Sequence, residues 1–291
     1  MIKTSDKKIL LSGGSRGIGL AIAKKFANEG AKIAIMAKTE QPHPILPGTI
    51  HSAAEEIEDE GGTALPIVTD IRFEEQVKDA VEKTVNEFGG IDIVINNASA
   101  ISLTPTLFTE MKRFDLMFDV NVRGTFLVSK EAIPYLLKSE NPHILNLSPP
   151  LDMNKKWFSQ TLAYSMSKFG MSQCVLGMAE EFKKDGIAVN ALWPHSIIAT
   201  AAISNVVAGK EALQHCRKPE IIADAAHLII SKNSKEFTGK FCIDDVLLNN
   251  EGEKDFKKYR INQTKALWKD LFVPENTPQI ETLIDFVDPR N

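Results

Sequence analysis

A tyrosine and a lysine four residues apart have the clearest capacity for chemistry in this sequence. Tyr164 and Lys168 occur in the stretch AYSMSK, within a segment that has the periodicity of a helix. Residues i and i+4 lie on one face of a helix about one turn apart, so the ammonium can sit near the phenol. A free tyrosine titrates near pH 10, and lowering its pKa to about 7 takes roughly 4 kcal/mol. If the neighbouring lysine is buried and lowers the pKa of the phenol, Tyr164 could exchange a proton with a substrate hydroxyl or carbonyl. The same spacing also fits an ordinary surface pair.

A glycine-rich turn near the N-terminus predicts a site for a phosphate group. The stretch SGGSRGIG places Gly13, Gly17 and Gly19 between an apolar run and a helix-period segment. Glycines permit positive φ and a close approach of a pyrophosphate to the backbone, and the helix that follows offers unpaired N–H groups to the anion. A plain tight turn is the alternative.

The charges near this turn favour a phosphorylated dinucleotide. An acidic residue at the end of the second strand would bind the ribose 2′-hydroxyl of NAD, but this sequence has Lys38 there and Arg16 in the turn. Two positive charges favour the 2′-phosphate, so we expect NADP(H) in preference to NAD(H); a solvated surface position is the alternative for Lys38. Asp70, which ends the third strand, could accept from the adenine amino group or cap the next helix.

Two asparagines add to the pattern. Asn97 and Ala98, in the stretch NNAS, follow the fourth strand and should line the cofactor cleft, unless they form only a turn. Asn121 lies inside an otherwise helical segment, DVNVRG, where asparagine is a mediocre helix former. We therefore expect the Asn121 side chain to hold a water molecule or to kink the helix.

Strand-length apolar runs alternate with helix-period segments up to about residue 190. The runs cover 8–14, 32–38, 64–70, 91–98, 143–148 and 187–194, and the candidate helices cover 17–29, 50–60, 73–88, 110–138 and 161–184. Nearly continuous apolar runs indicate strands covered on both faces, and each crossover can hold a helix. The pattern predicts an α/β protein with a Rossmann-type, doubly wound parallel sheet of about seven strands in three α/β/α layers.

The C-terminal part departs from this alternation. A seventh strand is expected at 238–248, so the main domain would span 1–250. Residues 251–291 are polar, apart from an amphipathic stretch, TKALWKDLF, at 264–272. We expect this segment to be an extension packed on the domain; a substrate lid or a partner contact is the alternative.

Composition and charge exclude several functional classes. The formal net charge of -4 argues against a nucleic-acid or anionic-membrane binder, because neutralising phosphates needs a basic surface. No run reaches the 18 apolar residues of a membrane span, and the N-terminal apolar run is too short for a signal peptide. The three cysteines form no C-x-x-C pair and the six histidines lack metal-binding spacing, so we expect no metal. These features predict a cytoplasmic protein with a small or neutral ligand.

Together the motifs resemble the short-chain dehydrogenase/reductase family, whose order and spacing they follow over about residues 7–250. The resemblance implies that Tyr164 accepts and donates the proton, that Lys168 binds the nicotinamide ribose and that Asn121 holds a relay water. It also implies a homodimer or homotetramer built through the helices that hold Asn121 and Tyr164. Cofactor contacts are expected from Gly13, Ser15, Arg16, Gly17, Ile18, Gly19, Lys38, Asp70, Asn97, Ala98, Tyr164, Lys168, Pro194 and Thr200.

A proline-rich insertion narrows the resemblance. The stretch AKTEQPHPILPG, together with NNASAISLT, HILNLSPPL and VLGMAEEFK, is similar to the hydroxysteroid dehydrogenase-like branch of that family. Animal members of the branch carry a C-terminal sterol-carrier domain and a peroxisomal signal, and we expect this chain to have neither. The usual Pro-Gly after the sixth strand is here Pro194-His195, which predicts a reshaped loop leading to Thr200.

Ser148 has two alternative roles. In most family members the fifth strand ends in a serine pair whose second serine orients the substrate oxygen, but Pro149 occupies that position here. Because side chains alternate faces along a strand, Ser148 would point away unless Pro149 and Pro150 twist the strand end. Ser148 is therefore either the catalytic serine or a strand-ending residue bonded to local backbone, and Ser159 and Thr161 are weaker substitutes.

These observations predict an NADP(H)-dependent oxidoreductase that transfers hydride between the nicotinamide and a hydroxyl or carbonyl carbon, with Tyr164 as general acid and base. A cofactor-binding homologue with little or no catalysis is the alternative. The substrate would be a small molecule, and several apolar side chains suggest a hydrophobic, lipid-like one, although they would equally serve as core. These side chains are Trp193, Ile197, Ile198, Trp268 and Phe272.

Overall fold

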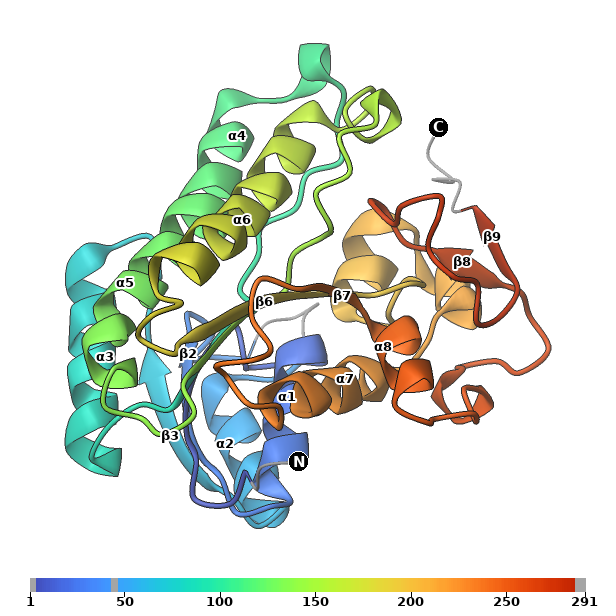
Figure 1. Ribbon diagram of the computed structural model, residues 1–291. Helices are drawn as coiled ribbons and strands as arrows, with labels where there is room; N and C mark the ends of the chain where they lie inside the picture. Colours follow the sequence, from blue (N-terminus) through green and yellow to red (C-terminus); the bar gives the residue numbers. More distant parts are fainter. Residues whose placement is uncertain (1–3, 43–46, 286–291) are drawn as a thin grey trace.

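The fold is an open parallel sheet with helices on both faces. A computed structural model describes residues 4–42 and 47–285 (Figure 1). The strands of the main sheet are β1 (Lys8–Ser12), β2 (Lys32–Ala37), β3 (Thr63–Val68), β4 (Ile93–Asn96), β5 (His143–Asn146), β6 (Ala188–Trp193) and β7 (Phe241–Ile243). The helices are α1 (Gly17–Ala27), α2 (Ile50–Asp59), α3 (Glu74–Phe88), α4 (Met111–Met117), α5 (Thr125–Leu136), α6 (Leu162–Glu181), α7 (Glu220–Ile230) and α8 (Asp244–Asn250). Two further strands, β8 (Leu267–Lys269) and β9 (Leu283–Asp285), form a separate parallel pair.

The strand order is β3-β2-β1-β4-β5-β6-β7, and all neighbours are parallel. This confirms the predicted Rossmann-type, doubly wound class. The order reverses between β1 and β4, because β1 to β3 run toward one edge of the sheet and β4 to β7 run toward the other. In such sheets ligands bind outside the carboxyl ends of the strands at this switch point.

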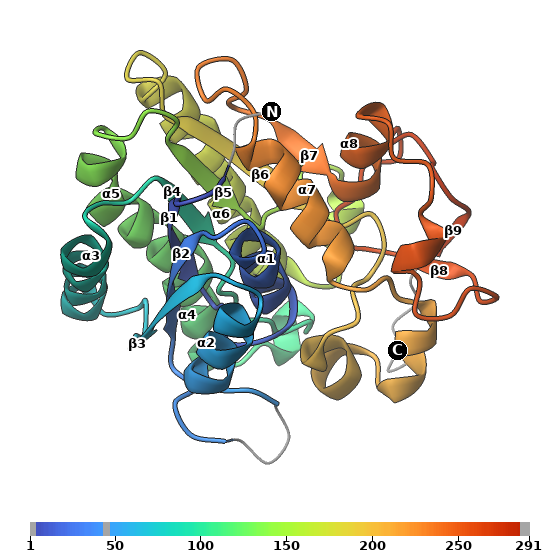
Figure 2. The same cartoon turned by 90° about the horizontal axis from the view of Figure 1, so that it is seen from below.

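Alternating side chains of the strands build the core on both faces of the sheet. Ile9 and Leu11 of β1 pack toward α1, α2 and α7, whereas Leu10 between them packs toward α3, α5 and α6. Figure 2 shows the two helical groups on opposite sides of the strands. Apolar side chains on both faces explain why the strands read as continuous apolar runs in the sequence.

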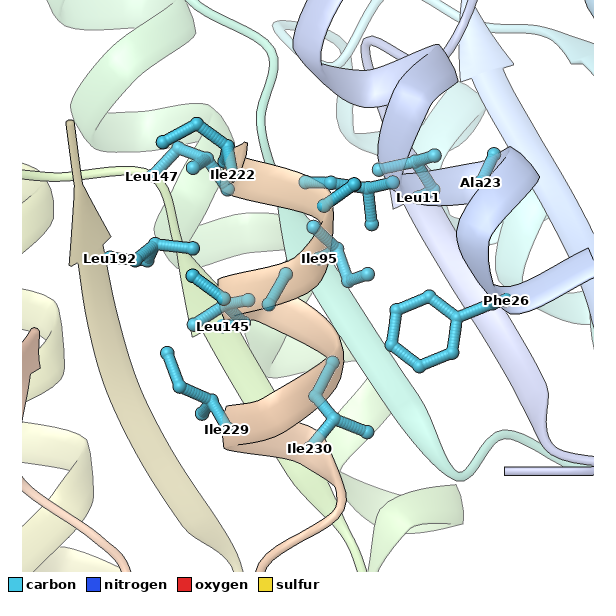
Figure 3. Packing of buried hydrophobic residues seen from close by; sticks show 14 of the residues in the cluster. Leu11, Ala23, Phe26, Ile95, Leu145, Leu147, Leu192, Ile222, Ile229 and Ile230 are labelled. Atoms are coloured by element: carbon cyan, nitrogen blue, oxygen red, sulfur yellow. The ribbon is translucent and has the colours of Figure 1, made fainter. Parts of the chain in front are cut away.

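Helix α7 was not among the predicted helices. Its sequence, EIIADAAHLII, is mostly apolar and mostly buried. The helix lies beside α1, and Ile222, Ile229 and Ile230 pack onto side chains from the sheet (Figure 3). Its polar positions recur at i, i+4 and i+7, so the sequence does carry a helical signal, but the predicted alternation stopped at about residue 190.

The predicted strand at 238–248 is wrong in its second half. Strand β7 ends at Ile243, and α8 begins at Asp244. The Asp244 carboxylate accepts hydrogen bonds from the backbone N–H groups of His195, at 2.9 Å, and Asp245, at 2.7 Å. Acidic residues at the start of a helix are stabilised by its free N–H groups, so the pair Asp244-Asp245 ends the strand.

The predicted single helix at 110–138 is interrupted. A π-helical turn, Phe118–Gly124, separates α4 from α5 and contains Asn121. The Asn121 side chain exchanges two hydrogen bonds with the backbone of Ala100, at 2.7 and 2.9 Å. Such turns inside helices are frequent at functional sites, and this one places Asn121 against the segment after β4.

The segment that follows α8 returns to the carboxyl end of β6. The N–H of Ile197 donates to the carbonyl of Trp268 at 2.9 Å, and the N–H of Asp270 donates to the carbonyl of His195 at 3.0 Å. In Figure 1 this segment, drawn in red, lies along the side of the domain that carries β7. Residues 270–273 thereby reach the end of the sheet at which ligands are expected.

Candidate active site

The glycine turn lies at the carboxyl end of β1, at the switch point of the sheet. Gly13 and Gly17 have φ of +74° and +57°, a left-handed backbone that favours glycine. A Cβ at Gly13 would lie 2.8 Å from Ala98 Cα, and one at Gly19 would lie 2.4 Å from the Gly13 carbonyl oxygen. The turn is therefore packed tightly against the segment after β4, and glycine is required by both conformation and space.

A cleft of about 540 Å³, here called the glycine-loop cleft, opens along this turn. Gly13, Ser15, Arg16, Gly17 and Ile18 line it, whereas Gly19 is buried beneath them. Helix α1 begins here with no side-chain cap and no acidic residue in its first turn. Uncapped amides at a helix start attract anions, so the cleft fits the pyrophosphate of a dinucleotide.

Positive side chains stand at the far end of the glycine-loop cleft. Both Arg16 and Lys38 line it. The Arg16 guanidinium donates to the carbonyl oxygens of Pro47 and Gly48, each at 2.8 Å, and so ties the described end of the proline-rich insertion to the cleft. Residues 43–46 of that insertion lie outside the described residues.

Asp70 also lines this end of the cleft, but its carboxylate is already paired. Arg72 donates to Asp70 Oδ1 at 2.9 Å and to Oδ2 at 2.6 Å, and Lys38 Nζ lies 3.7 Å from Oδ2. Burial alone would raise the pKa of Asp70, but the hydrogen bonds from Arg72 outweigh it and lower that pKa. Arg72 was not singled out in the sequence, and its contact occupies the acceptors that the adenine amino group would use.

Four further predicted residues line the glycine-loop cleft or a smaller cavity beside Tyr164. The Asn97 side chain donates to the Gly13 carbonyl at 2.8 Å, and the N–H of Ala98 donates to Ser12 Oγ at 3.2 Å. Thr200 lines both the glycine-loop cleft and a smaller cavity beside Tyr164, and Pro194 lines that smaller cavity.

Tyr164 and Lys168 occupy the first turns of α6, and both are buried. Lys168 Nζ donates to the Leu147 carbonyl at 2.7 Å and lies 5.1 Å from the centre of the Trp193 ring. Among the described residues the Tyr164 hydroxyl has no hydrogen-bond partner. Both side chains line the inner cavity, defined as the cavity of about 210 Å³ that joins the glycine-loop cleft through Ile18, Asn97 and Thr200.

Burial governs the acid–base properties of this pair. It raises the pKa of Tyr164 above its ordinary value, because a phenolate loses its hydration there. It lowers the pKa of Lys168 to about 7, and the nearby Asp270 carboxylate opposes this only in part. In the protein alone the tyrosine is therefore held in its neutral form.

Asn121 lies beneath the pair rather than in the cavity. Besides Ala100 it contacts Ser167, to whose hydroxyl it donates at 2.9 Å, and Ser167 Oγ in turn donates to the Tyr164 carbonyl at 2.8 Å. The side chain thus links the segment after β4 to the start of α6.

Ser148 does not line the cavity beside Tyr164. It is fully buried, and its hydroxyl has no hydrogen-bond partner among the described residues, while its neighbour Leu147 lines the inner cavity. Of the two weaker substitutes, Ser159 donates to the Lys156 carbonyl at 3.1 Å, and Thr161 lines a separate outer cavity of about 310 Å³.

The two cavities share a wall from the C-terminal segment. Asp270, Leu271 and Leu103 line both the inner and the outer cavity. Phe272, the next residue, has φ +65° and is fully buried. Its ring lies 5.9 Å from those of Tyr164 and Trp193, measured between ring centres. This left-handed turn, unusual for an aromatic residue, directs Phe272 into the core beside Tyr164.

A buried charge network anchors this wall. His195 Nδ1 lies 2.8 Å from Asp245, and Arg217 donates to the other oxygen of that carboxylate at 2.8 Å. Arg217 also donates to Glu281 at 2.5 Å. Asp270, Arg217 and Glu281 were not singled out in the sequence, where no local motif marks them as parts of one wall.

Residues 4–42 and 47–285 lack two kinds of feature. They contain no group of three or more His, Cys, Asp or Glu side chains placed to hold a metal ion. In the same part of the chain no helix is both long and apolar enough to cross a membrane.

Comparison with known proteins adds independent findings. The sequence profile described as short chain dehydrogenase matches residues 7–211. Hydroxysteroid dehydrogenase-like protein 2 of Danio rerio is 57% identical over 93% of this chain, and that of Homo sapiens is 56% identical over 92%. The match spans 65% and 63% of the length of these two relatives, so it covers less than two thirds of each.

A solved structure shares the fold closely. The crystal structure of a short chain dehydrogenase from Mycobacterium thermoresistibile aligns with a TM-score of 0.89 and 49% identity. The alignment covers 94% of this chain and 98% of that one. The similarity therefore extends beyond the matched profile into the C-terminal part of the chain.

Proposed function

The chain belongs to the short-chain dehydrogenase family of oxidoreductases, and on that premise we propose that it is an NADP(H)-dependent dehydrogenase or reductase of hydroxyl or carbonyl groups. The nicotinamide would supply or accept the hydride. The observation that carries the proposal is that Tyr164 and Lys168 line a cavity continuous with the glycine-loop cleft.

Tyr164 is the proposed general acid and base. Tyr164 lines the inner cavity, and its hydroxyl has no hydrogen-bond partner among the described residues, so it can bond to a substrate oxygen there. In the reductive direction Tyr164 Oη donates its proton to the carbonyl oxygen, and in the oxidative direction it receives the hydroxyl proton. Because burial favours the neutral phenol, the donating form is the ground state of the protein alone.

Lys168 is the proposed positioning and charge-stabilising partner. Its ammonium donates to the Leu147 carbonyl and to Met171 Sδ and lies over the Trp193 ring, and burial lowers its pKa to about 7. Ribose hydroxyls are the groups that would complete its hydrogen bonds. Asn121, buried under Tyr164, holds the π-helical turn against α6, and we propose that a relay water lies beside it.

The preference for NADP(H) is proposed from Arg16 and Lys38. Both line the end of the glycine-loop cleft, and no unpaired carboxylate among the described lining residues stands ready for a ribose 2′-hydroxyl, because Asp70 is paired with Arg72. A cationic end favours a 2′-phosphate over a hydroxyl.

The proposed substrate is apolar over most of its length. The inner cavity is lined by Ile101, Leu147, Trp193, Ile197 and Ile198 among others, so an alkyl or ring system would be better accommodated than a charged metabolite. Trp268, which was considered with these residues, stacks instead on His215 at 4.3 Å between ring centres.

A homo-oligomer is proposed from exposed apolar side chains on two adjoining helices. Phe126 on α5 and Met166 and Leu176 on α6 are exposed. A second copy of the chain is the proposed occupant of this face, as the family resemblance implies.

The experiment that tests the function joins cofactor binding to turnover. We expect tighter binding of NADPH than of NADH, and reduction of some members of a panel of apolar ketones. Tyr164→Phe should lower turnover by about 10²- to 10⁴-fold while NADPH affinity stays within about twofold. Tyr135→Phe, on α5 and outside the cavities, is the matched control.

The alternative is a cofactor-binding homologue with little or no catalysis. NADPH binding without turnover of any ketone or alcohol in the panel would favour it. Turnover that survives in Tyr164→Phe would instead contradict the role given to this tyrosine.

A further inference from the structure

The inner cavity contains an acidic side chain that the proposed function leaves without a role. Among the described residues its polar lining consists of Asn97, Ser99, Tyr164, Lys168, Thr200 and Asp270. The first two and Thr200 also line the glycine-loop cleft, and Tyr164 and Lys168 carry the proposed chemistry. Asp270 is the one that remains.

Asp270 stands at the junction of two cavities. It lines both the inner and the outer cavity, together with Leu271. Its backbone is fixed by the hydrogen bond from its N–H to the His195 carbonyl, and by the buried, left-handed Phe272 two residues later. A molecule bound beside Tyr164 in the inner cavity therefore lies in a space that this carboxylate also lines.

The Asp270 carboxylate can accept further hydrogen bonds. Oδ1 accepts the N–H of Leu271 at 2.7 Å, and this is its one hydrogen bond to the described residues, within which it also has no ion pair. A carboxylate among apolar side chains is costly without partners, and burial accordingly raises the pKa of Asp270 to about 7. A ligand that donates a hydrogen bond would relieve this cost.

The acid–base pair accounts for Asp270 only in part, because its charge supports the ammonium of Lys168 but forms no ion pair with it among the described residues. A negative charge near Tyr164 adds to the rise in the pKa of that phenol and so opposes the formation of a phenolate. A group that hinders the proposed proton transfer is better explained by an interaction with the substrate.

We propose that Asp270 is a specificity-determining residue that accepts a hydrogen bond from a second hydroxyl group of the substrate, located between the reacting carbon and an apolar chain. This rests on the proposed function, which places the reacting carbon at Tyr164. A hydroxyl suits the site better than an ammonium, because the cation of Lys168 lies in the same cavity and would repel a second positive charge.

The test compares ketones that differ by one hydroxyl group. The substrates are a long-chain ketone and a series of hydroxyketones of the same length with the hydroxyl at successive carbons, each with NADPH. For at least one position we expect the wild-type kcat/KM to exceed that of the plain ketone by about tenfold or more. Asp270→Leu should bring this ratio to about one, mainly through KM.

Controls separate this inference from other effects. Asp285→Asn removes a carboxylate from the outer cavity and should keep the ratio, since Asp285 does not line the inner cavity. Melting temperature and NADPH affinity verify that each variant is folded. An unchanged ratio in Asp270→Leu, or a stronger preference for an aminoketone, would overturn the inference and leave the proposed function standing.

A wild-type protein that turns over none of these ketones would instead count against the proposed function. Quenching of tryptophan fluorescence would then compare binding of the ketone and the hydroxyketones directly. Equal affinities for all of them would overturn the role of Asp270 as well, whereas tighter hydroxyketone binding that is lost in Asp270→Leu would support it.

Discussion

Arg217 donates a hydrogen bond of 2.8 Å to Asp245, and both side chains are completely shielded from solvent. The same guanidinium reaches Glu281, and the same carboxylate holds His195. The pair thus joins the loop after β6, the start of α8 and the C-terminal segment. These are the parts of the chain that support the wall of the inner cavity.

Replacing Arg217 should destabilise the protein strongly. Arg217→Met leaves the Asp245 carboxylate without its guanidinium partner in the interior, so we expect a loss of about 3–5 kcal/mol in the free energy of unfolding. Urea denaturation measures it. Lys25→Met, which breaks a partly exposed ion pair with Asp224, should cost less than about 1 kcal/mol. Equal losses in both variants would contradict the importance of burial here.

Lys38 should discriminate between the two dinucleotides. Its side chain is 60% exposed and lines the cleft, so Lys38→Ala should fold normally. We expect its affinity for NADPH to fall about tenfold, or about 1.4 kcal/mol, with little change for NADH. Titration by cofactor fluorescence gives both constants. Lys183→Ala, at an exposed lysine outside the lining of the cleft, is the control, and an equal fall for both cofactors would argue against a 2′-phosphate contact.

Ser148→Ala should leave catalysis almost intact. The hydroxyl is buried, has no partner among the described residues and does not line the inner cavity. We therefore propose a structural position for Ser148 and expect kcat to change by less than about threefold, against the 10²- to 10⁴-fold loss for Tyr164→Phe. Steady-state kinetics on one ketone compares the two variants. A loss in Ser148→Ala similar to that in Tyr164→Phe would restore the serine to the catalytic set.

His143 should make the protein sensitive to acid. Burial in β5 lowers the pKa of its imidazole to about 4, whereas an unfolded histidine titrates near 6.5. The unfolded chain therefore binds the proton first, so this contribution is complete above pH 6.5 and is lost as the pH falls toward 4. The loss approaches about 3 kcal/mol. Unfolding free energies from pH 7 to 4.5 should fall less steeply in His143→Gln than in the wild type or in the exposed control His51→Gln.

The outer face of α6 should control the oligomeric state. Leu176 is 58% exposed and would lie in an interface between copies. Leu176→Glu places a charge there, so we expect light scattering to show a smaller particle than the wild-type dimer or tetramer. Leu107→Glu, at a more exposed leucine away from these helices, should keep the wild-type mass. A wild-type monomer would refute the proposed assembly.

The main sheet was predictable because its strands are covered on both faces. Runs such as 32–38 and 187–194 match β2 and β6 closely, since burial on two sides leaves a continuous apolar stretch. The same reasoning failed at 238–248, where a short apolar run leads into a helix that starts at Asp244. It also missed α7, although the polar residues of that helix recur at helical spacing.

The site residues likewise divide into those that a local sequence motif reveals and those that it does not. Gly13, Tyr164 and Lys168 belong to local motifs whose spacing carries the chemistry, and the topology brings them to one end of the sheet. Asp270 carries no such local signal, because it reaches the inner cavity through contacts between distant segments, such as its backbone bond to His195, which the periodicity of a single sequence does not encode. Arg72 lies two residues after Asp70, which it contacts, but no motif marks it.

The wall of the inner cavity is made late during synthesis. Ile243, the end of β7, completes the seven-stranded sheet, and Asp270 follows it 27 positions later. A ribosome adds about 5–20 residues per second, so roughly one to five seconds separate the two points. A nascent chain can therefore form the glycine-loop cleft while the inner cavity beside Tyr164 still lacks one side. A cofactor bound at that stage would be in place before the wall with Asp270 closes the inner cavity.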